Sequence, residues 1–350
     1  MLTALSFASV LVLLILVHEL GHFVTARFFG IRVMEFGLGY PPRLLSIKRG
    51  ETIYSLNLLP LGGFVKLLGE EDPTQPDSLA SKGVGTRLIV LSAGAFMNAL
   101  LPVVIFSALF MVPQQTVVGE VVVREVVPDS PAARAGIVPG DTILKIDGHT
   151  LDNSSEVGFY LRLRLNAESN WLIQRGSIQE RVSLVPRLKP PEGQGAAGIR
   201  IETVNPRLVT RSLPFWKAIP RGAWRVGEVL VLAKNEITGW IVGAISPAMT
   251  GPIGIAQMTG EVARVGIMPL LEFTALLSIN LAIMNILPIP ALDGGRLVFV
   301  VLEWVRRGKR IPPEKEGFVH MVGFVLLITL IVVISFYDIQ RIFRGESLIP

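Results

Sequence analysis

The feature that most constrains this chain is an apolar segment near its start that contains three titratable side chains. Residues 4–29 are almost entirely apolar, and the strongly polar residues before Arg27 are His18, Glu19 and His22. The segment is long enough for a helix to cross the hydrocarbon core of a bilayer. An ionised carboxylate near the centre of such a helix costs about 2.5–3.5 kcal/mol. Glu19 therefore requires a function or a partner at that depth.

The composition indicates a membrane protein, because 50% of the residues are hydrophobic and 17% are charged. We predict a mainly α membrane protein with about four transmembrane helices, a membrane-associated β-region and an inserted α+β domain. The four transmembrane helices are expected within residues 1–30, 86–113, 266–295 and 317–337. The first is expected to be a helix rather than a cleaved signal peptide, because it has no early Lys or Arg.

The charge and the cysteine content exclude some binding partners and some kinds of metal site. The net charge is +5, and no run of Lys and Arg is interleaved with aromatic residues. We assign the basic excess to loops that face anionic lipid, and we predict no nucleic-acid partner. The chain has no cysteine, which removes disulfides, thiolate metal sites and cysteine nucleophiles. Any metal ion must be held by His and carboxylate groups.

Three segments between the predicted spans are predicted to have other structures. Residues 31–85 contain short apolar stretches broken by Gly-Gly, Pro-Pro and charges, which is typical of hairpin strands beside a membrane. Residues 117–188 have β-branched runs, Gly-rich turns and ordinary polarity, and they predict a water-soluble domain. Residues 206–265 are predicted to be an interfacial helical segment, because three tryptophans lie there among Lys, Arg and Glu. The alternative for this segment is a fifth span.

Lys and Arg are concentrated in the loops that follow the first and the third predicted span. These residues are Arg27, Arg32, Arg43, Lys48, Arg49, Lys66, Lys82 and Arg87 in the first loop, and Arg306, Arg307, Lys309, Arg310 and Lys315 in the second. Because loops rich in Lys and Arg remain in the cytoplasm, both loops are predicted to be cytoplasmic. The 117–188 domain and the C-terminal tail are then predicted on the opposite face.

The three polar residues of the first span form a zinc-hydrolase pattern, His18-Glu19-Leu20-Gly21-His22. Two histidines four residues apart project from one face of a helix and can bind one ion, while Glu19 lies beside them as a general base. We therefore predict a Zn2+ site. The alternative is an ordinary helix whose two histidines are satisfied by hydrogen bonds.

A catalytic zinc ion needs a third protein ligand, because one position remains open for water. Asp293 is the leading candidate, since it follows the third span in a segment that two prolines break. Broken helices survive in a membrane only beside a protein-enclosed cavity. Glu35 is the runner-up. His149 lies in the predicted soluble domain, and His320 lies at the start of the fourth span, where a histidine is more often structural.

Four motifs occur in order along the chain. They are His18-Glu19-Leu20-Gly21-His22, Phe36-Gly37-Leu38-Gly39 with Leu61-Gly62-Gly63-Phe64-Val65-Lys66, Gly251-Pro252-Ile253-Gly254-Ile255-Ala256, and the segment from Asn285 to Gly295. In this order they resemble the site-2 protease family, specifically its bacterial regulator-of-sigma-E-protease branch. The resemblance implies zinc bound by His18, His22 and Asp293, with Glu19 as the base and Asn285 as a polar group on the substrate side. It also implies a multi-pass protein of the bacterial inner membrane whose active site faces the cytoplasmic side.

The segment from Ser130 to Ile143, followed by Ile146-Asp147-Gly148, resembles a PDZ domain. Such domains bind extended peptides along a sheet edge. The chain has room for one PDZ domain, whereas the best-known family member has two. A peptide ligand on the extracytoplasmic side is therefore expected, and the alternative is a small β-rich spacer without a ligand.

Two further features have two interpretations each. Gly94 and Asn98 in the second span either allow close helix packing or add a polar contact near the active site. Residues 54–59 supply either an edge strand that captures the substrate backbone or a simple hairpin.

The predicted activity is that of a zinc metalloendopeptidase that cleaves transmembrane segments within the bilayer. The resemblance implies a single-span membrane protein as substrate, already trimmed by another protease, such as an anti-sigma factor or a remnant signal peptide. One alternative is a catalytically silent membrane adaptor that holds partners through its PDZ domain. Another is a zinc hydrolase that acts on lipid or a small amphiphile.

Overall fold

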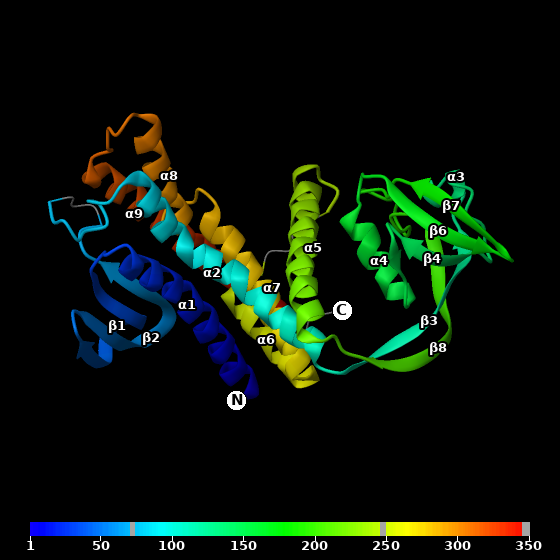
Figure 1. Ribbon diagram of the computed structural model, residues 1–350, viewed down its shortest axis with the longest axis horizontal. Coiled ribbons are helices and arrows are strands. Elements are labelled where there is room, and N and C mark those ends of the chain that lie inside the picture. The colour runs from blue at the N-terminus through cyan, green and yellow to red at the C-terminus, as the bar shows by residue number, and fades with distance from the viewer. Residues whose placement is uncertain (71–73, 246–249, 345–350) are drawn as a thin grey trace. The chain divides into compact units, whose positions relative to one another are not determined.

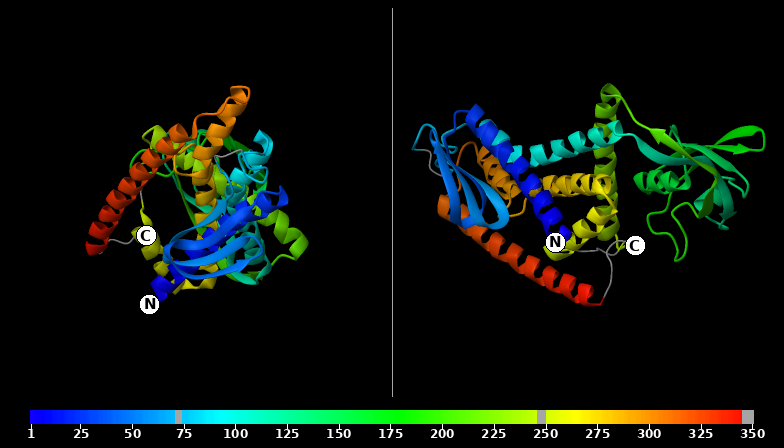
Figure 2. Two further views of the ribbon diagram at one scale, coloured as in Figure 1. Left: turned by 90° about the vertical axis from the view of Figure 1, so that its left-hand side faces the viewer. Right: turned by 90° about the horizontal axis from the view of Figure 1, so that it is seen from below.

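The computed structural model describes the chain except for residues 71–73, 246–249 and 345–350. The chain divides into two compact units, one formed by Met1–Leu109 with Met249–Pro350 and the other by Phe110–Ala248. Figure 1 traces the elements of both units, and Figure 2 gives two further views. Each unit has its own hydrophobic core.

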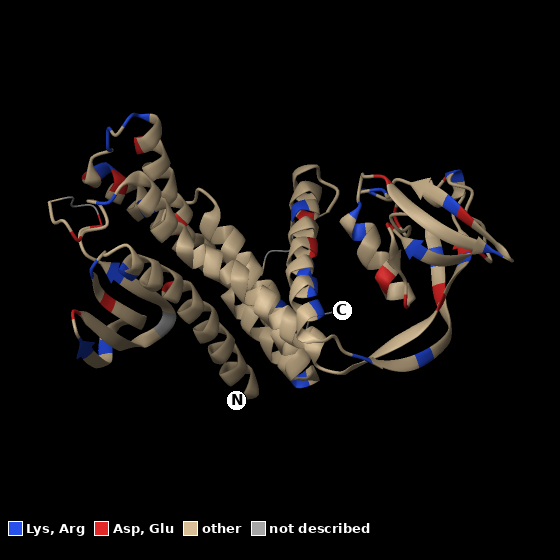
Figure 3. Cartoon of the chain, viewed as in Figure 1, with Lys and Arg blue, Asp and Glu red and all other residues tan. Residues whose placement is uncertain are grey.

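Among the described residues, four helices are long and apolar enough to cross a membrane. They are α1 (Leu2–Phe28), α2 (Val84–Met111), α7 (Ile267–Ile286) and α9 (Pro313–Phe343). The prediction of four such helices is confirmed. Figure 3 shows that few charged residues lie along α1, α2 and α7. In α9, only 6% of the most apolar stretch is buried, which is expected of a helix surrounded by lipid.

The predicted third span, residues 266–295, is not one continuous helix. Helix α7 ends at Ile286, and α8 (Asp293–Val305) begins after a non-helical segment. Pro288 and Pro290 lie in that segment, and a proline lacks the N–H that an α-helix needs. The break places Asp293 at the first position of a new helix.

Strands β1 (Val33–Arg49) and β2 (Thr52–Leu67) form an antiparallel two-stranded sheet, and β2 packs against α1. The register shifts several times, so that Phe36 has both Val65 and Tyr54 as partners. The first part of β1 therefore lies between two segments of β2.

The core of this first unit joins α1, the β1–β2 sheet, α2 and α8. Its buried residues are Ala26, Ile31, Val33, Leu67, Leu79, Val90, Leu91 and Val300. Ala26 follows His22 by one helical turn, so this core fixes the part of α1 that carries the histidines. Helix α6 (Pro252–Val265) packs against both α1 and α9.

The second unit is built on a six-stranded sheet with the order β7-β6-β4-β3-β8, and β5 pairs with β4. The strands are β3 (Gln114–Val126), β4 (Thr142–Ile146), β5 (His149–Thr150), β6 (Ser169–Arg175), β7 (Ile178–Leu184) and β8 (Ile199–Arg211). Three helices accompany them, α3 (Pro131–Arg134), α4 (Ser154–Leu163) and α5 (Phe215–Ile241). Trp171 on β6 is 1% exposed at the centre of the core.

Strand β8 departs from the predicted boundaries. It lies beyond residue 188, where the soluble domain was predicted to end, and its residues 206–211 begin the segment predicted to be helical. The strand pairs with β3, for example Thr203 with Val121. Because β3 and β8 are far apart in the sequence, local periodicity does not predict that they pair.

An ion pair between a buried aspartate and a partly exposed arginine lies in the second unit. Asp141 is fully buried and accepts hydrogen bonds from Arg175 Nε and Nη2, both at 2.8 Å, and from the Val138 N–H at 2.9 Å. Burial alone would raise the pKa of Asp141, but these donors hold it below its usual range. The pair lies entirely within this unit.

Candidate metal centre

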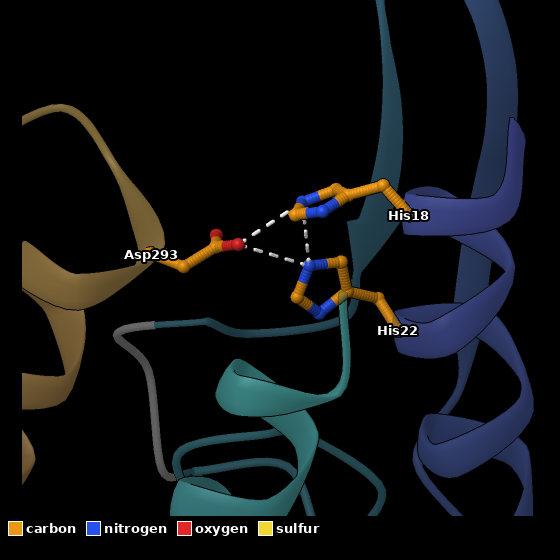
Figure 4. Close-up of side chains that lie close together, drawn as sticks. All are labelled: His18, His22 and Asp293. Atoms are coloured by element: carbon orange, nitrogen blue, oxygen red, sulfur yellow. Dashed lines mark hydrogen bonds and ion pairs between the residues drawn. The ribbon is translucent and has the colours of Figure 1, made fainter. Parts of the chain in front are cut away.

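Two histidines and one aspartate of the first unit converge on a single point. Nε2 of His18 lies 3.1 Å from Oδ2 of Asp293, Nε2 of His22 lies 3.2 Å from the same oxygen, and the two Nε2 atoms are 3.3 Å apart. Figure 4 shows the three side chains pointing toward one another from α1 and α8. In the part of the chain that the structure describes, this is the one group of three or more His and acidic residues that could hold a metal ion.

These separations suit one tetrahedral zinc ion. With zinc–ligand bonds of about 2.0–2.1 Å and tetrahedral angles, neighbouring ligand atoms lie about 3.3 Å apart. The observed distances of 3.1–3.3 Å match that value. Two imidazoles and one carboxylate are also a ligand set of catalytic zinc sites, which keep the fourth position for water. The three side chains therefore fit a catalytic zinc ion.

Helix α2 orients both imidazole rings. The Nδ1 atom of His22 donates a hydrogen bond to the Val90 carbonyl at 2.8 Å, which leaves Nε2 free for a metal. Nδ1 of His18 lies 3.4 Å from the amide of Asn98, which is 1% exposed. Among the described residues, Oδ1 of Asn98 has no hydrogen-bond partner. With a metal on Nε2, Nδ1 of His18 carries a proton, and Oδ1 of Asn98 accepts it when the amide turns that atom toward the ring.

Gly94 allows α2 to approach the two imidazoles closely. A Cβ atom at this position would overlap His22 Nε2 and His18 Cε1. On α1, a Cβ at Gly21, the residue before His22, would overlap the carbonyl of Ala93, the residue before Gly94. The glycines thus let α1 and α2 come together where the ligand atoms lie.

The substitution Gly94→Ala is expected to weaken zinc binding by about 10–100-fold, because the methyl group must displace the imidazoles. Gly85→Ala is the matched control: Gly85 is also in α2, and a Cβ there meets no atom within 4 Å. Zinc affinity is measured by competition with a chromophoric chelator. Equal affinity of the Gly94→Ala and Gly85→Ala proteins would show that this close approach is not needed.

The segment before α8 is held in a strained shape that presents Asp293. Ala291 has a φ of 76°, which residues with a side chain rarely adopt, and its N–H donates to Nδ1 of His320 at 3.0 Å. A Cβ at Gly294 would overlap the carbonyl of Leu287, and a Cβ at Gly323 of α9 would overlap Pro290. His320 therefore has a structural role beside the metal centre, which agrees with the interpretation of it as a structural residue.

Glu19 lies between the two histidines of the candidate metal centre and strand β2. It is half-buried and interacts electrostatically with His18, His22 and Asp293, and the backbone of Val65 is its hydrogen-bond partner. A Cβ at Gly63 would lie 3.0 Å from Cγ of Glu19. The β1–β2 sheet thus borders the side of the site on which Glu19 lies.

The other candidate residues lie elsewhere or have other partners. The carboxylate of Glu35 pairs with Arg43 at 2.7 Å, and it is not part of the group that can hold a metal. His149 belongs to the second unit and stacks on Tyr160, with ring centroids 4.8 Å apart. Asn285 is half-buried in the last turn of α7, before the segment that leads to Asp293, and is not a member of the metal-binding group.

Comparison with known proteins agrees with this geometry. The family described as Peptidase family M50 matches residues 6–330. A Clostridium perfringens protein, named as a zinc metalloprotease candidate, is 38% identical over 93% of this chain and 95% of its own length. The zinc metalloprotease RasP of Geobacillus kaustophilus is 29% identical over 97% of this chain and 98% of its length. The regulator of sigma-W protease RasP of Bacillus subtilis is 29% identical over 97% of this chain and 99% of its own length.

Part of the chain is also similar to solved structures. One of them is the PDZ domain of an SdrC-like protein from Listeria monocytogenes, with 26% identity and a TM-score of 0.21, and it covers 23% of this chain and 85% of that domain.

Proposed function

The chain belongs to peptidase family M50, and from this premise we propose that His18, His22 and Asp293 hold its zinc ion while Glu19 is the general base. The protein is a zinc metalloendopeptidase of the intramembrane type. The observation that carries the residue assignment is that three ligand atoms from α1 and α8 converge, with separations of 3.1–3.3 Å.

The side chains divide the chemistry among them. Bound zinc supplies a Lewis acid for the scissile carbonyl and makes water more acidic. Glu19 takes a proton from the attacking water and returns it to the leaving amine. Because a helical substrate hides its carbonyls in hydrogen bonds, it must unwind locally before attack. The β1–β2 sheet beside Glu19 and the amide of Asn285 are proposed to hold the unwound backbone in an extended shape.

The proposed substrate is a single-span membrane protein that another protease has already trimmed. The name of the Bacillus subtilis relative describes it as a regulator of sigma-W, which is consistent with an anti-sigma factor as substrate of this chain, and a remnant signal peptide has the same single-span chemistry. The second unit is proposed to be a PDZ domain with a peptide ligand. Strand β8 lies at the edge of its sheet, where an extended peptide can pair.

A cleavage assay in detergent separates this function from its rivals. Purified protein is incubated with a single-span peptide, with and without a chelator, and zinc is then restored. Peptide cleavage that stops with the chelator and returns with zinc supports the protease. A silent adaptor would bind the peptide without cutting it, and a lipid hydrolase would release fatty acid or headgroup instead.

The proposed location is the bacterial inner membrane, with the metal centre toward the cytoplasm and the second unit on the outer side. Helix α5 is proposed to lie in the membrane interface, because Trp216, Trp224 and Trp240 are at least 39% exposed.

This topology predicts that single cysteines at Lys48 and Ser155 react from opposite faces of the membrane. Both residues are exposed, and the chain has no native cysteine. An impermeant thiol reagent added to intact spheroplasts should label the Ser155→Cys protein, whereas Lys48→Cys should react only after lysis. Labelling of both variants in intact spheroplasts would overturn the proposed topology.

A further inference from the structure

A second cluster of charged side chains lies in the first unit, away from the metal ligands. Oε2 of Glu303 in α8 accepts from Nη2 of Arg87 in α2 at 2.6 Å, and Oε1 accepts from Nε of Arg310 at 3.2 Å. Arg310 also donates to the Ala80 carbonyl at 2.7 Å. The side chains of Arg87 and Glu303 are 9% and 10% exposed. A buried charged pair of this kind has a cost in desolvation, so its presence calls for a function.

The pair joins the two helices that position the metal ligands. Helix α2 carries Val90 and Asn98, which orient the histidine rings, and Arg87 lies one turn before Val90. Helix α8 carries Asp293 at its first position and Glu303 in its last turn. The distance of Asp293 from the imidazoles therefore depends on the position of α8 along α2.

The other contacts of α8 include an ion pair with the segment after β2, where Arg296 Nη1 donates to Glu70 Oε2 at 2.7 Å, and apolar packing. The non-helical segment before Asp293 interrupts the connection to α7, and the buried residues of α8 are Gly294, Gly295, Val300 and Glu303. Val300 packs in the core with Val90 and Leu91. Apolar packing tolerates small sliding movements, whereas a charge-assisted hydrogen bond has a narrow range of lengths. Among the described residues, the Arg87–Glu303 ion pair is thus a directional contact that joins α8 to α2 itself, whereas Arg296 joins α8 to the segment after β2.

We propose that the Arg87–Glu303 ion pair positions the metal ligands. The pair fixes the position of α8 along α2, so that Asp293 reaches the imidazoles of His18 and His22. Arg310 completes the coordination of the Glu303 carboxylate. Burial alone would raise the pKa of Glu303, but the guanidinium groups of Arg87 and Arg310 hold it below its usual range. The pair is therefore charged at neutral pH.

The test compares zinc binding in two proteins that each lack one ion pair with a buried carboxylate. Glu303→Gln removes the charge at nearly constant shape, and we expect zinc affinity to fall about tenfold. With Co2+ in place of zinc, the visible absorption spectrum should also change, because it reports the geometry of the ligands. The control is Asp141→Asn, which breaks the ion pair of the buried Asp141 with Arg175 in the second unit. It should lower the melting temperature without changing zinc affinity or the cobalt spectrum.

A double-mutant cycle shows whether the effect comes from the pair. Arg87→Gln should weaken zinc binding as Glu303→Gln does, and the double variant should bind zinc no more weakly than the weaker single variant, since one interaction is lost only once. Two independent losses that multiply would overturn the proposal. If the Gln variants do not fold, Glu303→Asp keeps the charge but shortens the reach. An unchanged cobalt spectrum and zinc affinity in that protein would also overturn it.

The inference rests on the proposed zinc centre. Zinc binding by the unaltered protein distinguishes failure of the proposed function from failure of the proposed role of the ion pair. A purified unaltered protein that binds no zinc would refute the proposed function itself. Zinc held equally well by the unaltered and Glu303→Gln proteins would refute only the positioning role of the ion pair.

Discussion

Replacing Glu19 with glutamine is expected to lower the rate of peptide cleavage by about 10²–10⁴-fold while zinc remains bound. The substitution removes the proton acceptor but keeps both imidazoles and Asp293. Glu19 is placed to act in this way because it interacts with all three proposed ligands and lies against β2. An amide of the same size keeps the packing against Gly63 but cannot accept the proton from water.

The measurement combines single-turnover cleavage of a single-span peptide with zinc content by elemental analysis. Glu35→Gln is the matched control, since Glu35 is also a half-buried carboxylate of the first unit but pairs with Arg43. It should keep both zinc and most of the activity. A Glu19→Gln protein that loses zinc in step with activity would make Glu19 a metal ligand rather than the base.

Asp293→Ala is expected to reduce bound zinc to a small fraction of that in the unaltered protein. The two histidines alone offer two ligands, and the carboxylate also supplies the negative charge that offsets a dication at a site of low dielectric. Oδ2 of Asp293 is the third atom of the converging group, at 3.1 and 3.2 Å from the imidazole nitrogens. Asp293→Asn should retain more zinc than Asp293→Ala, because an amide oxygen still coordinates.

Zinc per protein is measured on purified Asp293→Ala, Glu35→Ala and unaltered protein, with thermal melting as a check on folding. Glu35→Ala should keep its zinc. Full zinc in a folded Asp293→Ala protein, or loss only in Glu35→Ala, would move the third ligand elsewhere and remove the support for pairing α1 with α8.

Much of the candidate site could be predicted because its information is local. The spacing of His18 and His22 within one helix requires no knowledge of the fold, and a break at two prolines marks the position of Asp293. The family, the zinc cofactor and the peptidase activity predicted from the resemblance are confirmed by the comparisons. The assignment of the individual ligands remains a prediction that the geometry supports.

The rest of the site depends on contacts between distant parts of the chain. The Val90 carbonyl that orients His22 lies 68 residues away from it, and Asn98 lies 80 residues from His18. The sequence left Gly94 and Asn98 between two interpretations, because helix packing and a polar role require the same residue types. The Arg87–Glu303 pair joins distant parts of the chain, and of its two residues only Arg87 was assigned from the sequence, to a basic cytoplasmic loop.

The same limit applies to the fold. Apolar segments of sufficient length predict α1, α2, α7 and α9, because length and hydropathy are local properties. Strand β8 was not predicted, since its partner β3 lies far along the chain. The two prolines predicted a break in the third span, but not that a second helix, α8, begins at Asp293.

The central claim is that this chain cuts a peptide bond inside a membrane span with zinc held by His18, His22 and Asp293. The most direct test reconstitutes unaltered and Glu19→Gln proteins in lipid vesicles with a single-span substrate and determines the product masses. We expect zinc-dependent products whose new ends lie within the apolar segment of the substrate, and none with Glu19→Gln. Products cut only in the polar flanks, or the same products from the Glu19→Gln protein, would contradict the claim.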